Sequence, residues 1–340
     1  MKKLRKLGIA GVSLSLLPLS LLVTASTPSS AAASPVVNVV GYSIVSPAFT
    51  ALEKGFAATT AGAGVAFNNS FGASTTQAED VVAGQAADVV DFSQVPDLDL
   101  LVNAGLVSSS WQAYPASKPE HGFVTDSVVA IVVRAGNPEG ITGWNSLTHS
   151  GVQIVTPDPI SSGSARWNLL AAYESQLQQG KKPAKAKSYL NHLVGNVVSE
   201  PPSGSKALAT FLSGTGNVLL AYEADAETAK AAGDPIQIVN PQQNVLIQNP
   251  SALTTTGLTN PAAVAFYDYL YSSAGQAIWI GANFRATLPS AQTSNKGVFY
   301  TPTKLALVSQ LGGWTLVTNK YFAPSTGLVT KIESAHGYTS

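Results

Sequence analysis

The sequence predicts an α/β fold, and three observations lead to that prediction. Short β-branched runs alternate with segments of helical character along the chain. Several of these runs are almost continuously apolar, as expected of strands buried on both faces in mostly parallel sheets flanked by helices. The chain has 340 residues, enough for about two domains of ~150 residues each. The predicted strands are VVNVVGY (36–42), ADVVDF (87–92), SVVAIVVR (127–134), VQIVTP (152–157), NVLLAYE (217–223) and IQIVNP (236–241).

The first 33 residues have the three parts of an export signal. MKKLRK is basic, LGIAGVSLSLLPLSLLVTA is apolar, and SSAAAS offers small residues for cleavage after Ala33. The alternative is an uncleaved membrane anchor, which Pro18 and the serines of the apolar stretch disfavour. We therefore expect an exported protein, periplasmic or extracellular and associated with the cell surface.

Composition excludes several classes of function. The chain has no cysteine, which excludes disulfides, thiolate metal sites, cysteine nucleophiles and a lipidated cysteine. Residues 34–340 carry 15 basic and 19 acidic side chains, a net charge of −4, and no basic patch of the kind that nucleic acid requires. An anion that binds this protein must therefore be attracted by local dipoles.

Two turns in the first half of the chain have the features of helix starts. In GYSIVSPAF (41–49), Ser46 suits the N-cap position and Pro47 the first helical position. In NNSFGASTTQAEDVVAG (68–84), Ser74 and Gln77 have the spacing of a capping box.

Two similar turns lie in the second half. TPDPISSGSARWNLLAAYE (156–174) places Ser161–Ser164 between a predicted strand and a predicted helix. In SEPPSGSKALATFL (199–212), Ser203 or Ser205 caps a helix whose apolar side chains share one face.

These four turns favour an anion site. A helix N-terminus has unpaired N–H groups and about half a positive charge, and in open α/β sheets such turns meet at the carboxyl ends of the strands. Each turn taken singly is better explained by ordinary capping, and only the four turns together make an anion site an equal alternative. Arg166 supports the anion hypothesis, because a cation in the first helical turn opposes the helix dipole.

The remaining segments are less informative. QQGKKPAKAKSYLNHL (178–193) is the most charged part of the chain and is expected to be a solvated helical surface. FRATLPSAQTSNKGVF (284–299) is expected to be a polar loop, followed by a last helix that begins around Thr303.

Several ordered segments resemble the prokaryotic sulfate-binding proteins, the solute receptors of sulfate/thiosulfate ABC importers. TPDPISSGSARWNLLAA resembles the family's Pro-x-x-Ser-Gly-Gly-Ala-Arg-Trp-Asn signature. The resemblance extends to FGASTTQAEDVVAGQAADVV, VVRAGNPEGITGWNSL, NVLLAYEADA and YLYSSAGQAI, and so covers nearly all of the chain after residue 33.

The resemblance implies a type II periplasmic-binding-protein fold with two lobes, in which neutral donors hold one sulfate in the cleft. The lobes are expected to comprise residues 36–125 plus 245–300, and 126–244 plus 301–340 with the C-terminal helix. The residues at the family's ligand positions are Ser43, Ser74, Ser162, Gly163, Ser164, Ser203, Gly204 and Tyr222, and Arg166 is expected to support the loops from behind.

Three positions depart from the family pattern. Ser43 stands where the family has an Asp whose backbone N–H donates, and Ser164 replaces the second Gly of the turn. Tyr222 stands where the family has a donor Trp, and it could instead be an ordinary core aromatic. These departures leave thiosulfate, molybdate and phosphate open as alternatives to sulfate.

The residues at the four helix starts, SIVS (43–46), GAST (72–75), SSGS (161–164) and SGS (203–205), include no Asp or Glu, but Asp158, Glu200 and Glu223 are close in sequence, so phosphate stays open as an alternative. Sulfate needs donors only, whereas hydrogen phosphate also needs an acceptor for its proton, so the turns favour sulfate.

The sequence motifs give little support to the hypothesis that this protein is an enzyme. SGSK (203–206) matches S-x-x-K but lacks a K-T-G partner, and no metal-binding, P-loop or dinucleotide motif occurs. A secreted hydrolase remains a remote alternative. We expect a monomeric receptor without catalytic residues, metal or cofactor, which delivers its anion to a membrane permease.

Overall fold

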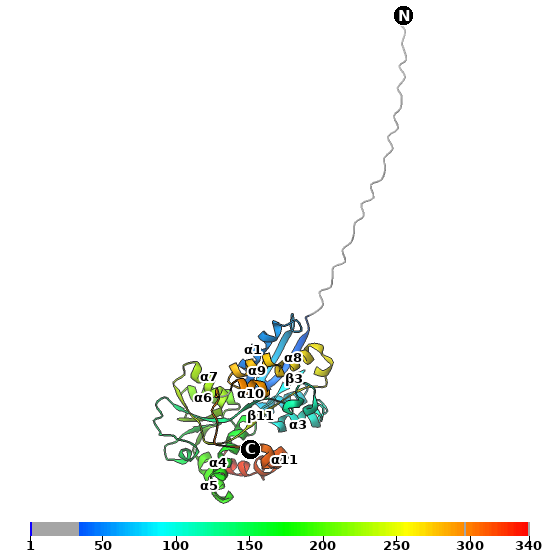
Figure 1. The fold of residues 1–340 in the computed structure, drawn as a ribbon. Coiled ribbons are helices and arrows are strands. Elements are labelled where there is room, and N and C mark those ends of the chain that lie inside the picture. The colour runs from blue at the N-terminus through cyan, green and yellow to red at the C-terminus, as the bar shows by residue number, and fades with distance from the viewer. Residues whose placement is uncertain (2–33, 296, 339–340) are drawn as a thin grey trace. The chain divides into compact units, whose positions relative to one another are not determined.

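Six strands end where six helices begin, at the junction between two β-sheets in the part of the chain that the structure describes. The computed structural model describes Met1, residues 34–295 and residues 297–338. Apart from Met1, the predicted signal segment lies outside the described residues. Helices flank both sheets, which confirms the predicted α/β class; in Figure 1, α4–α7 surround one sheet and α1, α3, α8 and α9 the other.

The first sheet has six strands in the order β12-β4-β11-β3-β1-β2. Its strands are β1 (Val36–Tyr42), β2 (Ala66–Gly72), β3 (Val89–Asp91), β4 (Phe123–Ser127), β11 (Ile247–Leu253) and β12 (Arg285–Ala286). Its helices are α1 (Ser46–Ala57), α2 (Ser74–Val82), α3 (Val95–Asn103), α8 (Pro261–Tyr271), α9 (Ser273–Gly281) and α10 (Pro289–Ser294), with 3-10 turns η1 (Ser43–Val45), η2 (Trp111–Ala113), η3 (Lys118–Glu120) and η5 (Gly257–Thr259). The helices α1 and α9 lie side by side in Figure 1. Phe49 of α1 packs edge-on against Trp279 of α9, with 5.5 Å between ring centroids, so segments distant in sequence share one core.

The second sheet has five strands in the order β7-β6-β8-β5-β9. Its strands are β5 (Val129–Arg134), β6 (Ile154–Val155), β7 (Val197–Ser199), β8 (Val218–Tyr222) and β9 (Ile236–Val239). Its helices are α4 (Gly163–Gln178), α5 (Pro183–Gly195), α6 (Gly204–Leu212) and α7 (Glu223–Ala231), with the 3-10 turn η4 (Trp144–Thr148). Most of α4 is buried, whereas the lysines of α5 are exposed, which confirms the predicted solvated helical surface.

Both sheets are mixed, so the prediction of mostly parallel sheets was wrong. β1, β2 and β3 are parallel to one another, as are β6, β7 and β8, but β5 and β11 run antiparallel to their neighbours. The reason is that β5 and β11 follow the two passages of the chain between the sheets. Each enters its sheet from the junction, whereas the six parallel strands end there.

The C-terminal region is more divided than predicted. Instead of one helix from Thr303, it contains β13 (Lys304–Ala306), η6 (Val308–Leu311), α11 (Gly313–Val317), a π-helical turn η7 (Thr318–Phe322) and α12 (Leu328–Ala335). β13 pairs with β10 (Gln243–Val245). Positive φ angles of 96° at Gly312 and 84° at Gly313 interrupt the helical path. Trp314 then packs edge-on against Trp167 of α4 at 4.8 Å.

The predicted polar loop at 284–299 was also wrong in part, because it contains β12 and α10. Pro289 occupies the first position of α10. A backbone N–H at this position would have no partner within the helix, so the N–H that proline lacks is not needed there. Within the described residues, no helix combines the length and the apolar character needed to cross a membrane.

Candidate functional site

The four predicted turns lie at the carboxyl ends of parallel strands and contact one another. η1 and α1 follow β1, α2 follows β2, α4 follows β6, and α6 follows β7. In an α/β fold this edge of the sheet is where ligands bind. Two further helices start at the same edge: α3 follows β3, and α7 follows β8.

The loop before α4 is organised by one carboxylate. Asp158 accepts hydrogen bonds from the Ile160 N–H at 2.8 Å and from Ser161 Oγ at 2.9 Å. Ser162 occupies the N-cap position, and its Oγ lies 2.8 Å from Ser164 Oγ. Both hydroxyls are buried, so Ser164 adds a hydroxyl to the turn without unfolding it.

Gly163 allows α4 to approach the first sheet closely. A Cβ at this position would lie 2.8 Å from Ser93 Cβ and 2.9 Å from Ser93 Oγ, closer than ordinary packing allows. The glycine of the ISSGSA segment is therefore required by the contact with the turn between β3 and α3.

The start of α6 contacts two of the other turns, η1 and the first turn of α4. Ser203 caps this helix by accepting from the Lys206 N–H at 3.4 Å, as predicted. A Cβ on Gly204 would lie 2.7 Å from Ile44 Cδ1 and 3.1 Å from Ser164 Oγ. The next N–H, that of Ser205, donates to Ser43 Oγ at 3.3 Å, which joins α6 to η1.

Two predicted helix caps in the first half were wrong. The N-cap residue of α1 is Val45, and Ser46 is the first helical residue. In α2 the N-cap residue is Ala73, because the side chains of the expected capping box have other partners. Ser74 Oγ donates to Asp97 Oδ2 at 2.6 Å, and Gln77 Oε1 accepts from Ser70 Oγ at 2.7 Å.

Tyr222 is buried at the end of β8 and is the N-cap residue of α7. Its ring lies 6.0 Å from that of Tyr42, as in a core aromatic, but its hydroxyl lies 2.7 Å from Ser93 Oγ. Burial raises the pKa of this hydroxyl, so it stays protonated and keeps its hydrogen for donation. Tyr222 is therefore both a core residue and a polar group of the junction.

Sequence reasoning missed the helix start after β3, which contributes Ser93, Gln94 and Asp97. Asp97 is buried and accepts from Ser74 Oγ, from Thr75 Oγ1 at 2.8 Å and from Gln94 Nε2 at 3.0 Å. The signal was present: in DFSQVPDL a strand is followed by Ser93, a proline in the first helical turn and an acidic residue in the same turn.

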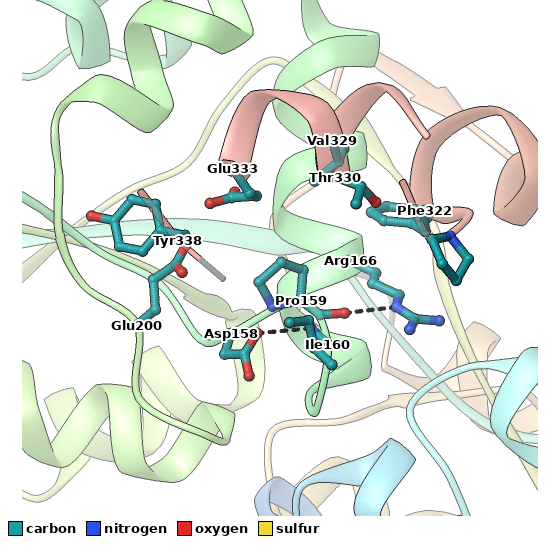
Figure 2. A pocket seen from close by; sticks show the side chains of 11 residues that line it. Asp158, Pro159, Ile160, Arg166, Glu200, Phe322, Val329, Thr330, Glu333 and Tyr338 are labelled. Atoms are coloured by element: carbon teal, nitrogen blue, oxygen red, sulfur yellow. Dashed lines mark hydrogen bonds between the residues drawn. The ribbon is translucent and has the colours of Figure 1, made fainter. Parts of the chain in front are cut away.

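Arg166 supports the loop before its own helix. Its Nε donates to the Pro159 carbonyl at 2.8 Å, and its guanidinium faces the Phe322 ring at 5.6 Å (Figure 2). Burial lowers the pKa of Arg166, and the carboxylates of Asp97 and Asp158 oppose this shift. Burial likewise raises the pKa of Asp97, and Arg166 opposes it, so the two groups stabilise each other's charges.

A cavity of about 150 Å³ lies beside this loop and is closed on one side by α12. Figure 2 shows Asp158, Glu200, Glu333 and Tyr338 at one end, and Arg166 and Phe322 at the other. Burial and the neighbouring Glu333 raise the pKa of Glu200 to about 9. This cavity is lined in part by the loop before α4, through Asp158, Pro159 and Ile160.

The clustered turns offer hydrogen-bond donors from backbone N–H groups and hydroxyls. Six helix N-termini and several hydroxyls meet at the junction. Among the residues that the structure describes, no three His, Asp or Glu side chains converge so that they could hold a metal ion. The arrangement suits a small anion that is bound through neutral groups.

The chain is similar to known receptors over most of its length. Residues 37–285 match the family described as bacterial extracellular solute-binding protein. A sulfate-binding protein of Synechococcus elongatus is 33% identical over 307 residues, covering 88% of this chain and 87% of that protein. A thiosulfate-binding protein of Escherichia coli is 28% identical, covering 83% of this chain and 85% of that protein. The solved structure of the sulfate-binding protein SubI from Mycobacterium tuberculosis superposes with a TM-score of 0.79 at 38% identity, covering 83% of this chain and 98% of that one.

Proposed function

This chain belongs to the bacterial extracellular solute-binding proteins, within the sulfate- and thiosulfate-binding group, and from that premise we propose that it captures sulfate at the junction of its two sheets and delivers it to an ABC importer. The observation that carries the proposal is the meeting of six helix starts, four of them rich in serine and glycine, at the junction of the two sheets. Their N–H groups and dipoles attract an anion without a cationic side chain.

The contacts of Asp97 favour sulfate over hydrogen phosphate. Asp97 contacts the first turn of α2, and its two oxygens already accept hydrogen bonds from Ser74, Thr75 and Gln94. It therefore has little capacity left to accept the proton of a hydrogen phosphate ion. Thiosulfate is the second candidate, because a thiosulfate-binding protein is among the relatives.

The remaining parts of the proposal follow from the same premise. The ligand contacts are Ser43, Ser74, Ser162, Gly163, Ser164, Ser203, Gly204 and Tyr222, with Arg166 holding the loop behind them. The two lobes comprise residues 36–125 with 245–300, and 126–244 with 301–340. The protein acts outside the cytoplasm as a monomer and performs no chemistry on its ligand.

The test is a calorimetric titration of the purified protein with sulfate, thiosulfate, molybdate and phosphate. We expect sulfate to bind most tightly and to be recovered unmodified. At 100 times its Kd it would stabilise the fold by about 2.7 kcal/mol, which a thermal melt detects. Absence of heat and of stabilisation with all four anions would refute the proposed function.

A further inference from the structure

Ser93, in the turn between β3 and α3, has every polar group bonded to a residue of the junction. Its N–H donates to Ser74 Oγ at 2.9 Å, and its carbonyl accepts from Trp167 Nε1 at 2.7 Å. Asn249 Nδ2 donates to the same carbonyl at 3.1 Å. Ser93 Oγ lies 2.7 Å from Tyr222 OH. Ser93 therefore touches groups that come from both sheets, and only 1% of its surface is exposed.

The pairing of two hydroxyls leaves one hydrogen over. Ser93 and Tyr222 carry one O–H each, and the bond between their oxygens uses one hydrogen, whichever group donates. The side chain of Asn249 also bonds the Tyr222 hydroxyl, but as a donor, so it accepts neither hydrogen. The hydrogen bonds of the described residues include no acceptor for the second hydrogen of the pair. A buried donor without an acceptor is unfavourable by about 1–3 kcal/mol, so a ligand that supplies an acceptor is stabilised there.

The unused hydrogen lies among the groups that the sequence predicts as ligand contacts. Ser93 Oγ would lie 2.9 Å from a Cβ on Gly163, so it borders the first turn of α4 directly. The Ser93 N–H holds the Ser74 hydroxyl, whose own hydrogen is engaged by Asp97. The Ser74 hydroxyl therefore has no hydrogen left to donate to a ligand. Between β3 and the first turn of α4, the hydroxyl that can donate to a ligand belongs to the pair of Ser93 and Tyr222.

We propose that Ser93, paired with Tyr222, is an anion-binding residue of this site and that the pair donates one O–H to the bound sulfate. The inference rests on the proposed function and adds a contact from the β3–α3 turn. Because the two hydroxyls share one donor, they act as a unit.

The test compares sulfate affinities by calorimetry for the wild-type protein, Ser93→Ala and the control Ser251→Ala. Ser251 is also a buried serine of the first sheet, but its Oγ bonds to the Val90 carbonyl. We expect Ser93→Ala to raise the Kd tenfold or more, as for loss of a hydrogen bond to a charged group, and Ser251→Ala to leave it unchanged. The melting temperature of the sulfate-free protein should differ little between the two variants.

A double-mutant cycle with Tyr222→Phe tests the sharing of one donor. Each single variant leaves one O–H free to donate, so we expect Ser93→Ala/Tyr222→Phe to bind sulfate more weakly than the sum of the two single losses predicts. Losses that add would overturn the shared donor, and an unchanged Kd in Ser93→Ala would overturn the role of Ser93. A lower sulfate-free melting temperature with unchanged Kd would assign Ser93 to folding alone. If the wild-type protein binds none of the four anions, the proposed function fails, and this inference fails with it.

Discussion

The backbone N–H of Thr75 donates to the carbonyl of Ser161 at 3.1 Å, so the first turn of α2 is bonded directly to the loop before α4. These two segments belong to different sheets. The turns that we propose to hold the anion are therefore in contact with one another. Substitutions at their contact points should change anion affinity more than fold stability.

Ser162→Ala should weaken sulfate binding by roughly 1.5–3 kcal/mol, because one hydroxyl next to a charged ligand is lost. Ser162 Oγ lies 2.8 Å from Ser164 Oγ, at the start of α4. The matched control is Ser175→Ala in the same helix, where the hydroxyl donates to the Ala172 carbonyl at 2.7 Å. Calorimetric titration measures both, and wild-type affinity in Ser162→Ala would remove this turn from the site.

Gly163→Ala should weaken sulfate binding and lower the melting temperature, because the new Cβ would lie 2.8 Å from Ser93 Cβ. Overpacking of this kind costs about 1–3 kcal/mol. Gly281→Ala is the control, since a Cβ there has no heavy atom within 4 Å. Thermal melts with and without sulfate separate the two effects; if both alanine variants behave alike, the close approach of α4 to Ser93 is unimportant.

Apart from the partly exposed β9, the strands that sequence patterns predicted are those with mostly buried side chains. The run 36–42 coincides with β1, and the run 217–223 contains β8. β11 was missed because IQNPSAL contains a proline and polar residues, yet these are buried. Its polar groups are satisfied by partners distant in sequence, such as the Val90 carbonyl for Ser251 Oγ.

Each turn of the site could be predicted from local sequence, but the hydrogen bonds between the turns could not. Serine and glycine before an apolar helix identify a helix start from local sequence alone. The pairing of Ser93 with Tyr222 spans 129 residues, so no local pattern contains it. The capping box at Ser74 failed for the same reason, since Asp97 is a stronger partner for its hydroxyl than a backbone N–H.

Arg285→Ala should destabilise the fold by about 3 kcal/mol, because it leaves a buried carboxylate without its partner. Arg285 Nε lies 2.7 Å from Glu223 Oε2 and Arg285 Nη2 lies 2.8 Å from Glu223 Oε1, which joins β12 to the start of α7. Lys230→Ala is the control, since its pair with Glu227 spans 3.6 Å at the surface and should contribute under about 1 kcal/mol. Urea denaturation measures both, and equal losses would show that burial of the Arg285 pair is unimportant.

Stability should fall as pH rises from about 5 to 9, in part because of the carboxyl pair between α12 and the loop before α6. Burial and Glu333 raise the pKa of Glu200 from 4.5 to about 9, and burial raises that of Glu333 to about 7. A pKa that is raised on folding stabilises the native state below the unfolded pKa, and this contribution is lost as pH rises through the folded pKa. Asp158, Arg166 and Tyr338 line the same cavity. These three residues are the same in the wild type and in the Glu333→Gln variant described next, so they do not account for a difference between the two proteins.

Glu333→Gln should therefore flatten the dependence of the unfolding free energy on pH and raise stability at pH 8 relative to the wild type. The amide removes the repelling charge beside Glu200 and can donate a hydrogen bond to it. Glu139→Gln, at an exposed position, is the control and should follow the wild-type curve. Urea titrations at pH 5, 7 and 9, in buffers without sulfate or phosphate, give the three curves. Parallel curves for Glu333→Gln and the wild type would mean that the two glutamates do not interact across the cavity.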